Sequence, residues 1–515
     1  MSGTDNRVVV IGGGLAGIAA ACDLAEADMP VTLLEARPVL GGKTWSFRDE
    51  QTGMTVDNGQ HVFLGCCTAY QAFLRRLGIE RQTQMQRRMR VPILLAGAQP
   101  RTKRRLKSAL WASGQQIPAG LAAECANTPQ SRRDFTALHA PLAPISIGGL
   151  LGAPACSAGI SAGACLEESR WPLPAPLHLL PSFLRLPMLS WREKLRAAQT
   201  LLAIMRAGKR GRFRCDSQSF ADWLRERSES EQAIKYLWNL ITLPTVNEDC
   251  EHASAGLALM VFQEGLLRRA DGARIGWASV GLSELVAEAA WRYLRKRGTE
   301  VRLSCRAASI ELCDGQVSGV RLVNGELLSA LQVIVALPHY LLAGLLPDGW
   351  RAHPFFAHAA QLQTSPIVGV NLWLDRRVLD EPLAAVMGRQ ETYWVFDKGA
   401  LLGLGPKDGQ YLTVSISAAR AWLERSRDEI ITQVRGDLEA ALPALRGAGI
   451  SHALVIKERQ ATFSGSPGSL ANRLPAETPL PGLLLAGAWT DTGWPATMEG
   501  AVRSGQRAAW MTVHR

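Results

Sequence analysis

The stretch RVVVIGGGLAGIAAACDLAEADMPVTLLE, residues 7–35, determines the fold class of this chain. It opens with a continuous apolar run of the kind found in buried parallel strands. A glycine-rich turn then leads into an alanine-rich helical pattern that extends to about Ala27, and a second apolar strand ends before Glu35. Strand, glycine turn, helix, strand and acid make one βαβ unit of about 30 residues. The pattern therefore predicts a parallel sheet with a nucleotide bound at the first turn.

The three glycines of this turn have separate physical functions. Gly12 permits the sharp turn after the strand, Gly14 lets a pyrophosphate approach the backbone, and Gly17 lets the helix lie close to the sheet. The helix N-terminus at Leu15 and Ala16 offers N–H groups and the positive end of the helix dipole to phosphates. A turn that serves only packing is the alternative interpretation of the same glycines.

The residues after the second strand favour FAD over NAD. Glu35 is placed to accept hydrogen bonds from the adenosine ribose, and its charge would repel the 2′-phosphate of NADP. The loop that begins at Ala36 contains the glycine pair Gly41-Gly42, followed by Lys43. Such a loop can fold back along the pyrophosphate, with Lys43 adding positive charge. A flexible surface loop is the alternative.

A second strand–helix unit lies near the C-terminus. The apolar run 483–487 ends at Gly487, and a helix is expected from about Pro495, because proline is well tolerated at the first helical position. Free N–H groups around Thr497 and Met498 would face an anion, which suits a reduced flavin. Three small residues spaced by four would permit close packing of this helix: Ala496, Gly500 and Ser504. A terminal helix that only packs is the alternative.

Four motifs together resemble the FAD-dependent amine oxidase and phytoene desaturase superfamily. They are GGGLAG (12–17), EARPVLGGKTWSF (35–47), VDNGQHVFLG (56–65) and LLLAGAWTDTGWPATMEGAVRSGQRAA (483–509). More specific stretches resemble the squalene-associated branch, hydroxysqualene dehydroxylase. They are TWSFRD, DNGQHVFLG, PLPAPLHLLPSFLRLPMLSWREKLRA, SPIVGVNLW and WTDTGWPATMEGAVRSG. The resemblance covers most of residues 7–95 and 171–515.

The resemblance implies an α/β chain, α+β overall, with a Rossmann-like FAD domain built from non-contiguous segments and an inserted mixed sheet-plus-helix substrate domain. The expected FAD segments are residues 1–80, 273–345 and 456–515. The expected substrate segments are 81–272, with an irregular insertion at 112–168, and 346–455. The resemblance also places Ala307 beside the adenine, and Gly59, Gly487, Trp494 and Met498 beside the flavin.

Two positions depart from the superfamily pattern. Ala488 stands where relatives usually have an aspartate that hydrogen-bonds the ribityl chain, so one FAD contact is lost. Lys43 replaces the commoner arginine, which keeps the charge and loses the bidentate fork.

Three titratable residues are candidates for catalysis, and each has a structural alternative. His61 is nearest the expected flavin loop and either contacts the substrate or transfers a proton, or else is a hydrogen-bonded structural histidine. Asp57 is expected to anchor a turn and its backbone. Asp491 either caps its loop or contacts flavin or substrate.

Composition limits the partners. Lys and Arg exceed Asp and Glu by 57 to 46, which suits an anionic partner. Residues 182–214 interleave basic and apolar side chains and predict contact with an anionic membrane surface, with a solvated helix face as the alternative. No nucleic-acid-binding motif is present. Ten scattered cysteines and nine dispersed histidines predict neither a disulfide framework nor a metal site. No signal peptide or membrane span is expected, so the predicted location is cytoplasmic and peripheral to the inner membrane face.

The resemblance implies reduction of hydroxysqualene to squalene, a hydrophobic isoprenoid, for hopanoid synthesis. An external donor must reduce the flavin, and the sequence does not identify it. One alternative is a desaturase or amine oxidase that takes hydride from its substrate. The other is a non-catalytic protein with the flavin fold.

Overall fold

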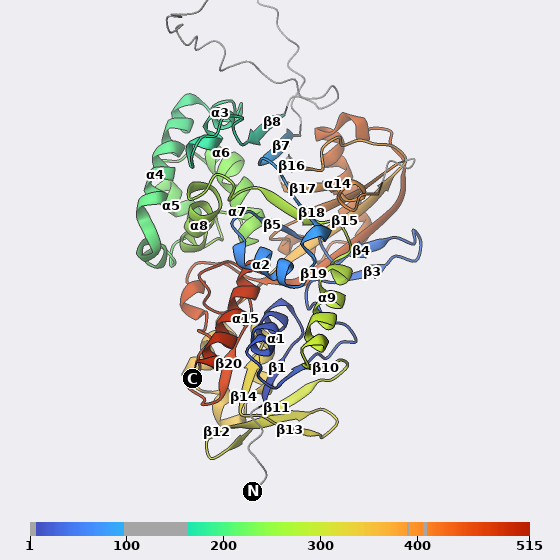
Figure 1. Ribbon diagram of the computed structural model, residues 1–515. Coiled ribbons are helices and arrows are strands. Elements are labelled where there is room, and N and C mark those ends of the chain that lie inside the picture. The colour runs from blue at the N-terminus through green and yellow to red at the C-terminus, as the bar shows by residue number, and fades with distance from the viewer. Residues whose placement is uncertain (1–6, 97–162, 389–390, 405–408, 515) are drawn as a thin grey trace, which may run out of the picture.

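The computed structural model describes residues 7–96, 163–388, 391–404 and 409–514 (Figure 1). A parallel sheet forms one domain. Its strand order is β10 (Glu300–Arg302), β2 (Val31–Leu34), β1 (Val8–Ile11), β14 (Gln332–Val335) and β20 (Leu483–Leu485). Strands from three distant parts of the chain therefore build one sheet, and the predicted FAD-domain fold of non-contiguous segments is confirmed.

Two helices from opposite ends of the chain pack on this sheet and against each other. Helix α1 (Leu15–Glu26) contacts α15 (Met498–Val513) along its length. A Cβ on Gly505 would lie 2.0 Å from the carbonyl oxygen of Ala16, so only glycine permits this close approach. Two further helices complete the layer: α9 (Leu282–Lys296) and α2 (Thr68–Arg76).

Helix α15 begins three residues later than the sequence predicts. Thr497 is the N-cap, and its hydroxyl accepts a hydrogen bond of 3.1 Å from the N–H of Gly500. Pro495 therefore lies in the preceding loop and not at the first helical position. Ala496 also precedes the helix, whereas Gly500 and Ser504 are buried on it, and Gly505 makes the close approach to α1.

The second domain is built on a mixed seven-stranded sheet. Its order is β19 (Ile450–Phe463), β15 (Thr364–Leu374), β18 (Gln410–Ile416), β17 (Thr392–Asp397), β16 (Leu383–Met387), β7 (Arg90–Leu95) and β8 (Ala164–Glu167). Alternate residues of β15 and β18, such as Val370 and Val414, pack beneath α14 (Arg427–Ala441), because successive side chains of a strand point to opposite faces of the sheet. The opposite face carries Trp373 and Tyr411, whose rings stack 4.4 Å apart.

Two predicted boundaries differ from the structure. Strand β19 is continuous from Ile450 to Phe463, so the expected boundary between residues 455 and 456 falls inside the substrate-domain sheet. Strand β8 pairs with β7, so residues 164–167, at the end of the expected irregular insertion, are an edge strand. The rest of that insertion, 112–162, lies outside the described residues.

A helical lobe adjoins the seven-stranded sheet (Figure 1). Its elements are η3 (Leu177–Leu179), α3 (Leu180–Leu184), α4 (Trp191–Arg214), α5 (Phe220–Arg225), α6 (Glu231–Ala233), η4 (Ile234–Trp238), α7 (Asn239–Val246), α8 (Ala255–Val261) and η5 (Phe262–Leu267). Edge-to-face contacts between Trp238 and both Phe220 and Phe262 fill its core. A reciprocal capping box between Ser190 and Glu193 fixes the start of α4.

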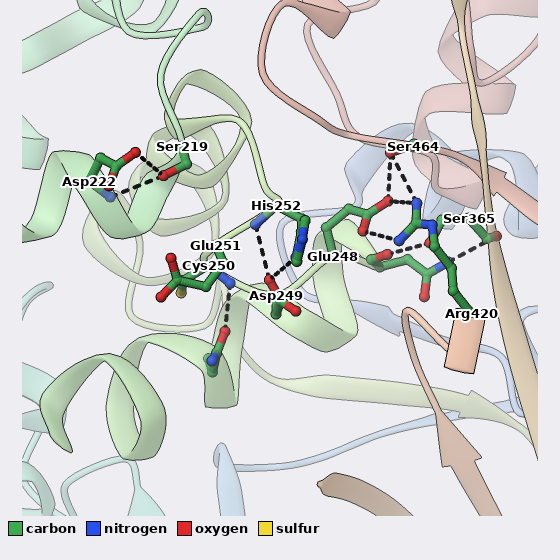
Figure 2. Close-up of polar contacts among 12 residues, drawn as sticks. Ser219, Asp222, Glu248, Asp249, Cys250, Glu251, His252, Ser365, Arg420 and Ser464 are labelled. Carbon is green, nitrogen blue, oxygen red and sulfur yellow. Dashed lines mark hydrogen bonds and ion pairs between the residues drawn. The ribbon is translucent and has the colours of Figure 1, made fainter. Parts of the chain in front are cut away.

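The loop after α7 fastens the lobe to the sheet (Figure 2). Arg420 forms a bidentate pair with the buried carboxylate of Glu248, at 2.6 and 2.7 Å, and Ser464 donates to the same carboxylate. Asn247 adopts a left-handed backbone conformation, and its side-chain amide donates to the carbonyl of Ser365. These contacts hold the lobe in one orientation on the sheet.

The remaining elements connect the two domains or cover their edges. The small sheets are β3 (Ser46–Arg48) with β4 (Thr55–Asp57); β5 (Val62–Leu64), β9 (Ile275–Ala278) and β6 (Thr83–Met85); and β11 (Ala307–Cys313), β12 (Gln316–Leu322) and β13 (Leu327–Ser329). The short helices are η1 (Glu80–Gln82), α10 (His339–Leu345), α11 (Asp348–Arg351), α12 (Pro354–Gln361), α13 (Lys398–Leu401), η6 (Arg420–Trp422), η7 (Pro443–Leu445) and η8 (Ser469–Asn472).

The contact of α1 with the first turn gives a prediction. A Cβ on Gly17 would lie 1.9 Å from the carbonyl oxygen of Gly12, so Gly17→Ala forces the helix away from the sheet. We expect the free energy of unfolding of the FAD-loaded protein to fall by about 3 kcal/mol or more. The control is Gly436→Ala on α14, where a Cβ meets open space and should add about 0.5–1 kcal/mol. Equal denaturation midpoints for the two variants would contradict the packing argument.

Candidate FAD site

The glycine turn has the geometry that its sequence predicts. Gly12 has a φ of +108°, which places it in the region that glycine alone adopts readily. Gly14 is the N-cap of α1 and contributes no side-chain hydrogen bond, and the first turn of α1 contains no acidic residue. The N–H groups at Leu15 and Ala16 therefore remain available to an anion at the positive end of the helix.

The second glycine pair packs directly on the first turn. The N–H of Gly41 donates to the carbonyl of Gly13 over 2.8 Å. A Cβ on Gly42 would lie 2.7 Å from the Cα of Gly14. The loop is therefore folded back over the turn, as expected for a loop that follows a pyrophosphate, and the alternative of a free surface loop does not describe it.

Lys43 makes contacts that the sequence did not predict. Its ammonium group donates to the carbonyls of Gln460 and Ala461 on β19, the second at 3.0 Å. Burial lowers its pKa, although the side chain retains exposed surface. Lys43 thus joins the glycine loops to the seven-stranded sheet.

Glu35 lies at the end of β2 and is held by backbone donors. Its carboxylate accepts hydrogen bonds from the N–H groups of Gly13 and Arg37, at 2.8 and 2.9 Å. The side chain is buried, and each oxygen keeps a further lone pair for a ribose hydroxyl. The N–H of Cys305 donates to the carbonyl of Glu35, which brings the start of β11 at Ala307 next to this end of the site. Ala36 is exposed beside it.

The loop after β4 contains a buried ion pair that sequence reasoning missed. The ammonium group of Lys398, on α13 of the second domain, lies 2.5 Å from the carboxylate of Asp57. Asp57 also accepts hydrogen bonds from the hydroxyl of Ser46 and from the N–H of Leu282 at the start of α9. Asp57 is thus an anchor, as predicted. It holds β3, α9 and the second domain, however, and not its own turn. No local signal identified Lys398, because its partner is 341 residues away.

His61 lies in the electrostatic field of this pair. Burial lowers its pKa to about 4, with Asp57 opposing the shift and Lys398 adding to it. No hydrogen-bond partner of the His61 ring exists among the described residues, so the interpretation as a hydrogen-bonded structural histidine is not what the structure shows. The ring is neutral at neutral pH and has one N–H donor and one acceptor nitrogen free.

The same loop holds further polar groups that lack partners. The side-chain oxygens of Asn58 and Gln60 are buried and accept no hydrogen bond within the described part of the chain. A Cβ on Gly59 would meet nothing within 4 Å. Buried acceptor oxygens normally have hydrogen-bond partners. These two lie beside open space, so a polar ring that binds there could supply the missing N–H donors.

The closing loop, 487–497, is organised by a buried arginine that was not predicted. Arg473 donates to the carbonyls of Ala488, Trp489 and Thr490, and one of its nitrogens, Nη1, has no partner within the described chain. Burial lowers its pKa to about 10, so it stays charged. The chain therefore places a cation behind the backbone of Ala488.

The N-terminus of α15 is tied to α2 by another missed residue. Glu499 is fully buried and accepts hydrogen bonds from the N–H groups of Ala69 and Tyr70, at 3.1 and 2.7 Å. Arg503 pairs with it and lies over the ring of Trp494. Met498 is half-buried at the start of the same helix.

Gly487 and Asp491 mark the two ends of the closing loop. Gly487 has a φ of +140°, and its N–H donates to the hydroxyl of Ser504. Asp491 is exposed, and its carboxylate accepts no hydrogen bond from the described residues; its charge opposes the lowering of the pKa of Arg473. Asp491 therefore does not have the capping role that the sequence suggested.

These residues fit a flavin dinucleotide. The acid, the uncapped helix and the folded-back loop would hold the ribose and pyrophosphate, and the loop at 58–61 with the start of α15 would hold the flavin ring. A separate cavity of about 260 Å³ adjoins α2. Two of its arginines, Arg269 and Arg274, already pair with Asp271 and Glu168, and none of its lining residues belongs to the dinucleotide site.

A two-domain fold with this site defines the class of flavin-dependent oxidoreductases. Residues 15–511 match the family of flavin containing amine oxidoreductases, and the chain belongs to that family. FAD is its cofactor. The chain is therefore an FAD-dependent oxidoreductase of the amine oxidase and phytoene desaturase superfamily.

Relatives and solved structures match this chain over nearly its whole length. The 15-cis-phytoene desaturase of Arabidopsis thaliana is 26% identical over 97% of this chain and 78% of its own length. The 15-cis-phytoene desaturase of Synechococcus elongatus is 23% identical over 99% of this chain and 96% of its own. A putrescine oxidase variant has the same fold, with a TM-score of 0.67 at 17% identity over 99% of both chains.

The Asp57–Lys398 pair gives a prediction that two single variants and their combination check. Lys398→Met leaves a buried carboxylate without its counter-charge, so we expect the free energy of unfolding to fall by about 3–5 kcal/mol. Adding Asp57→Asn removes that charge and should recover most of the loss, as urea denaturation of the FAD-loaded variants would show. The control Arg435→Met breaks the exposed pair with Glu439 and should cost less than about 0.5 kcal/mol. A double variant as unstable as the sum of both singles would contradict the coupling.

The lowered pKa of His61 predicts a pH dependence of stability. Because the folded pKa of about 4 lies below the ordinary value, the unfolded chain binds this proton more readily. The contribution of the neutral His61 ring to the free energy of unfolding is complete above about pH 6.5 and is lost as the pH falls towards 4. Relative to His61→Gln, the wild-type protein should lose roughly 3 kcal/mol at most between pH 7 and 4, measured by denaturant titration. Parallel stability curves for the two proteins would show that His61 is not buried as described.

Proposed function

We propose that this enzyme reduces hydroxysqualene to squalene and so supplies squalene for hopanoid synthesis. The curated relatives quoted above are named as desaturases of phytoene, which supports an isoprenoid substrate. The stretches PLPAPLHLLPSFLRLPMLSWREKLRA and SPIVGVNLW, which resemble the squalene-associated branch, support the dehydroxylation.

The observation that carries the proposal is the polar cluster of His61, Asp57 and Lys398 beside the flavin loop. A hydrocarbon that loses hydrogen presents no hydroxyl to which the free N–H of His61 could donate. Hydroxysqualene presents one hydroxyl, and removal of that hydroxyl requires a hydrogen-bond donor and a field that tolerates developing charge. The free N–H of His61 and the pair behind it supply both.

The reaction exchanges an allylic C–O bond for a C–H bond. The hydroxyl takes up a proton that comes from the solvent and leaves as water, and the carbon accepts a hydride in place of the C–O bond. FAD, when bound and reduced, supplies the hydride. His61 holds the hydroxyl by its ring N–H, and its low pKa keeps it from carrying a competing positive charge. The carboxylate of Asp57 stabilises positive charge that develops on the allylic carbon, and Lys398 keeps that carboxylate in position.

A desaturase that takes hydride from its substrate is the second candidate. The names of the relatives favour it, because both are called phytoene desaturases and each matches at least 97% of this chain. In that reaction the proton from the substrate needs an acceptor, and the free acceptor nitrogen of His61 fits this task.

Product identity separates the two candidates. The FAD-loaded protein, reduced with dithionite without oxygen, should convert hydroxysqualene to squalene, identified by mass spectrometry. His61→Leu should slow this conversion about tenfold or more, and His61→Asn, which keeps an N–H donor, should recover part of it. His514→Leu, an exposed control, should leave the rate unchanged. Absence of squalene, together with conversion of phytoene by the oxidised protein, would establish desaturation instead.

A further inference from the structure

An apolar face lies on the outside of the helical lobe. It consists of Leu180 and Leu184 on α3 and Trp191, Leu195, Leu202 and Met205 on α4. Trp191 is 71% exposed and Leu195 63% exposed. Half of the exposed large hydrophobic side chains in the described part of the chain lie between Trp171 and Phe213, so the exposure is concentrated and not scattered.

The four residues on α4 form a continuous stripe. At about 100° per residue, Trp191, Leu195, Leu202 and Met205 fall within an arc of about 80°. The stripe ends where Gly208 interrupts the helical backbone. The buried Lys194 donates to the carbonyl of Leu184, which brings the end of α3 against the start of the stripe. Both helices therefore contribute to one apolar face.

Positive charge surrounds this face without neutralisation. Arg192, Arg206, Lys209, Arg210 and Arg214 form no ion pair with any carboxylate of the described residues. The one acid between residues 170 and 214 is Glu193, and its carboxylate is occupied by Ser190 and Ser230. The neighbourhood of the apolar face thus has a strong positive potential.

We propose that this face binds the surface of a bilayer that contains anionic lipid. The apolar side chains enter the boundary between headgroups and acyl chains, and the arginines contact lipid phosphates. A second copy of the chain is the other possible partner. Two such faces would bring their unneutralised cations together and repel each other, so the charge favours the anionic bilayer. Within the described residues, no helix is long and apolar enough to cross a membrane, so the contact is peripheral.

This inference does not depend on the substrate. The exposed stripe and its cations are properties of α3 and α4 alone, and the test below uses vesicles without any isoprenoid. Failure of the squalene assay would therefore leave the membrane contact intact, and failure to bind vesicles would leave the reaction intact.

Vesicle sedimentation tests the contact. The full-length FAD-loaded protein should sediment with vesicles of phosphatidylcholine containing about one quarter phosphatidylglycerol at about 0.05 M salt, and much less with phosphatidylcholine alone. Raising the salt to about 0.5 M should weaken the binding about tenfold while a part that depends on apolar insertion persists.

Two pairs of substitutions separate the apolar and the ionic contributions. Trp191→Ala with Leu195→Ala should weaken binding about tenfold or more at both salt concentrations. Arg206→Glu with Arg210→Glu should weaken it about twentyfold at low salt. The matched controls are Leu327→Ala with Trp510→Ala, and Lys296→Glu with Arg427→Glu; all four side chains are exposed and lie on other elements. Thermal unfolding of each variant verifies that the fold is retained.

The inference is overturned by any of three results. The first is that the wild-type protein fails to sediment with anionic vesicles at low salt. The second is that the control pairs reduce binding as much as the pairs on α4. The third is that vesicle binding is absent and the protein is a dimer, which the Trp191→Ala, Leu195→Ala variant converts to a monomer. Selective loss with the α4 variants and none with the controls supports it.

Discussion

The carboxylate of Asp57 joins the two domains at the place where flavin and substrate are expected to meet. It binds the ammonium group of Lys398 from the second domain, the hydroxyl of Ser46 from the β3–β4 hairpin and the first N–H of α9. A buried ion pair of this kind adds little net stability compared with apolar packing, but a single missing partner is expensive. Its main effect is therefore geometric, because it permits one relative placement of three elements.

The closing loop depends on a comparable arrangement. Arg473 satisfies three successive backbone carbonyls, and Glu499 binds the free N–H groups of α2. Each charged side chain hydrogen-bonds backbone groups and does not interact with side chains alone. The flavin end of the site is thus built from loops whose backbone polar groups are already fixed, which limits the rearrangement needed on binding.

Sequence reasoning succeeded where the physical cause is local. The turn at Gly12 follows from backbone sterics and the βαβ unit from the pattern of apolar residues, and both are present. Lys398, Arg473 and Glu499 were missed because their partners lie far away in the chain or are backbone atoms that carry no sequence signal. The start of α15 was placed too early for a related reason: proline at 495 is compatible with a helix start, but the hydroxyl of Thr497 decides it.

The interleaved order of the parallel sheet has a consequence for biosynthesis. Strand β1 lies between β2 and β14, and β14 needs β20, which ends at Leu485. On a ribosome that adds about 5–20 residues per second, the first βαβ unit therefore waits for tens of seconds with both strand edges and one helix face open. These edges and this face stay exposed during that interval, and synthesis of β20 and α15 is the step that allows the dinucleotide domain to close.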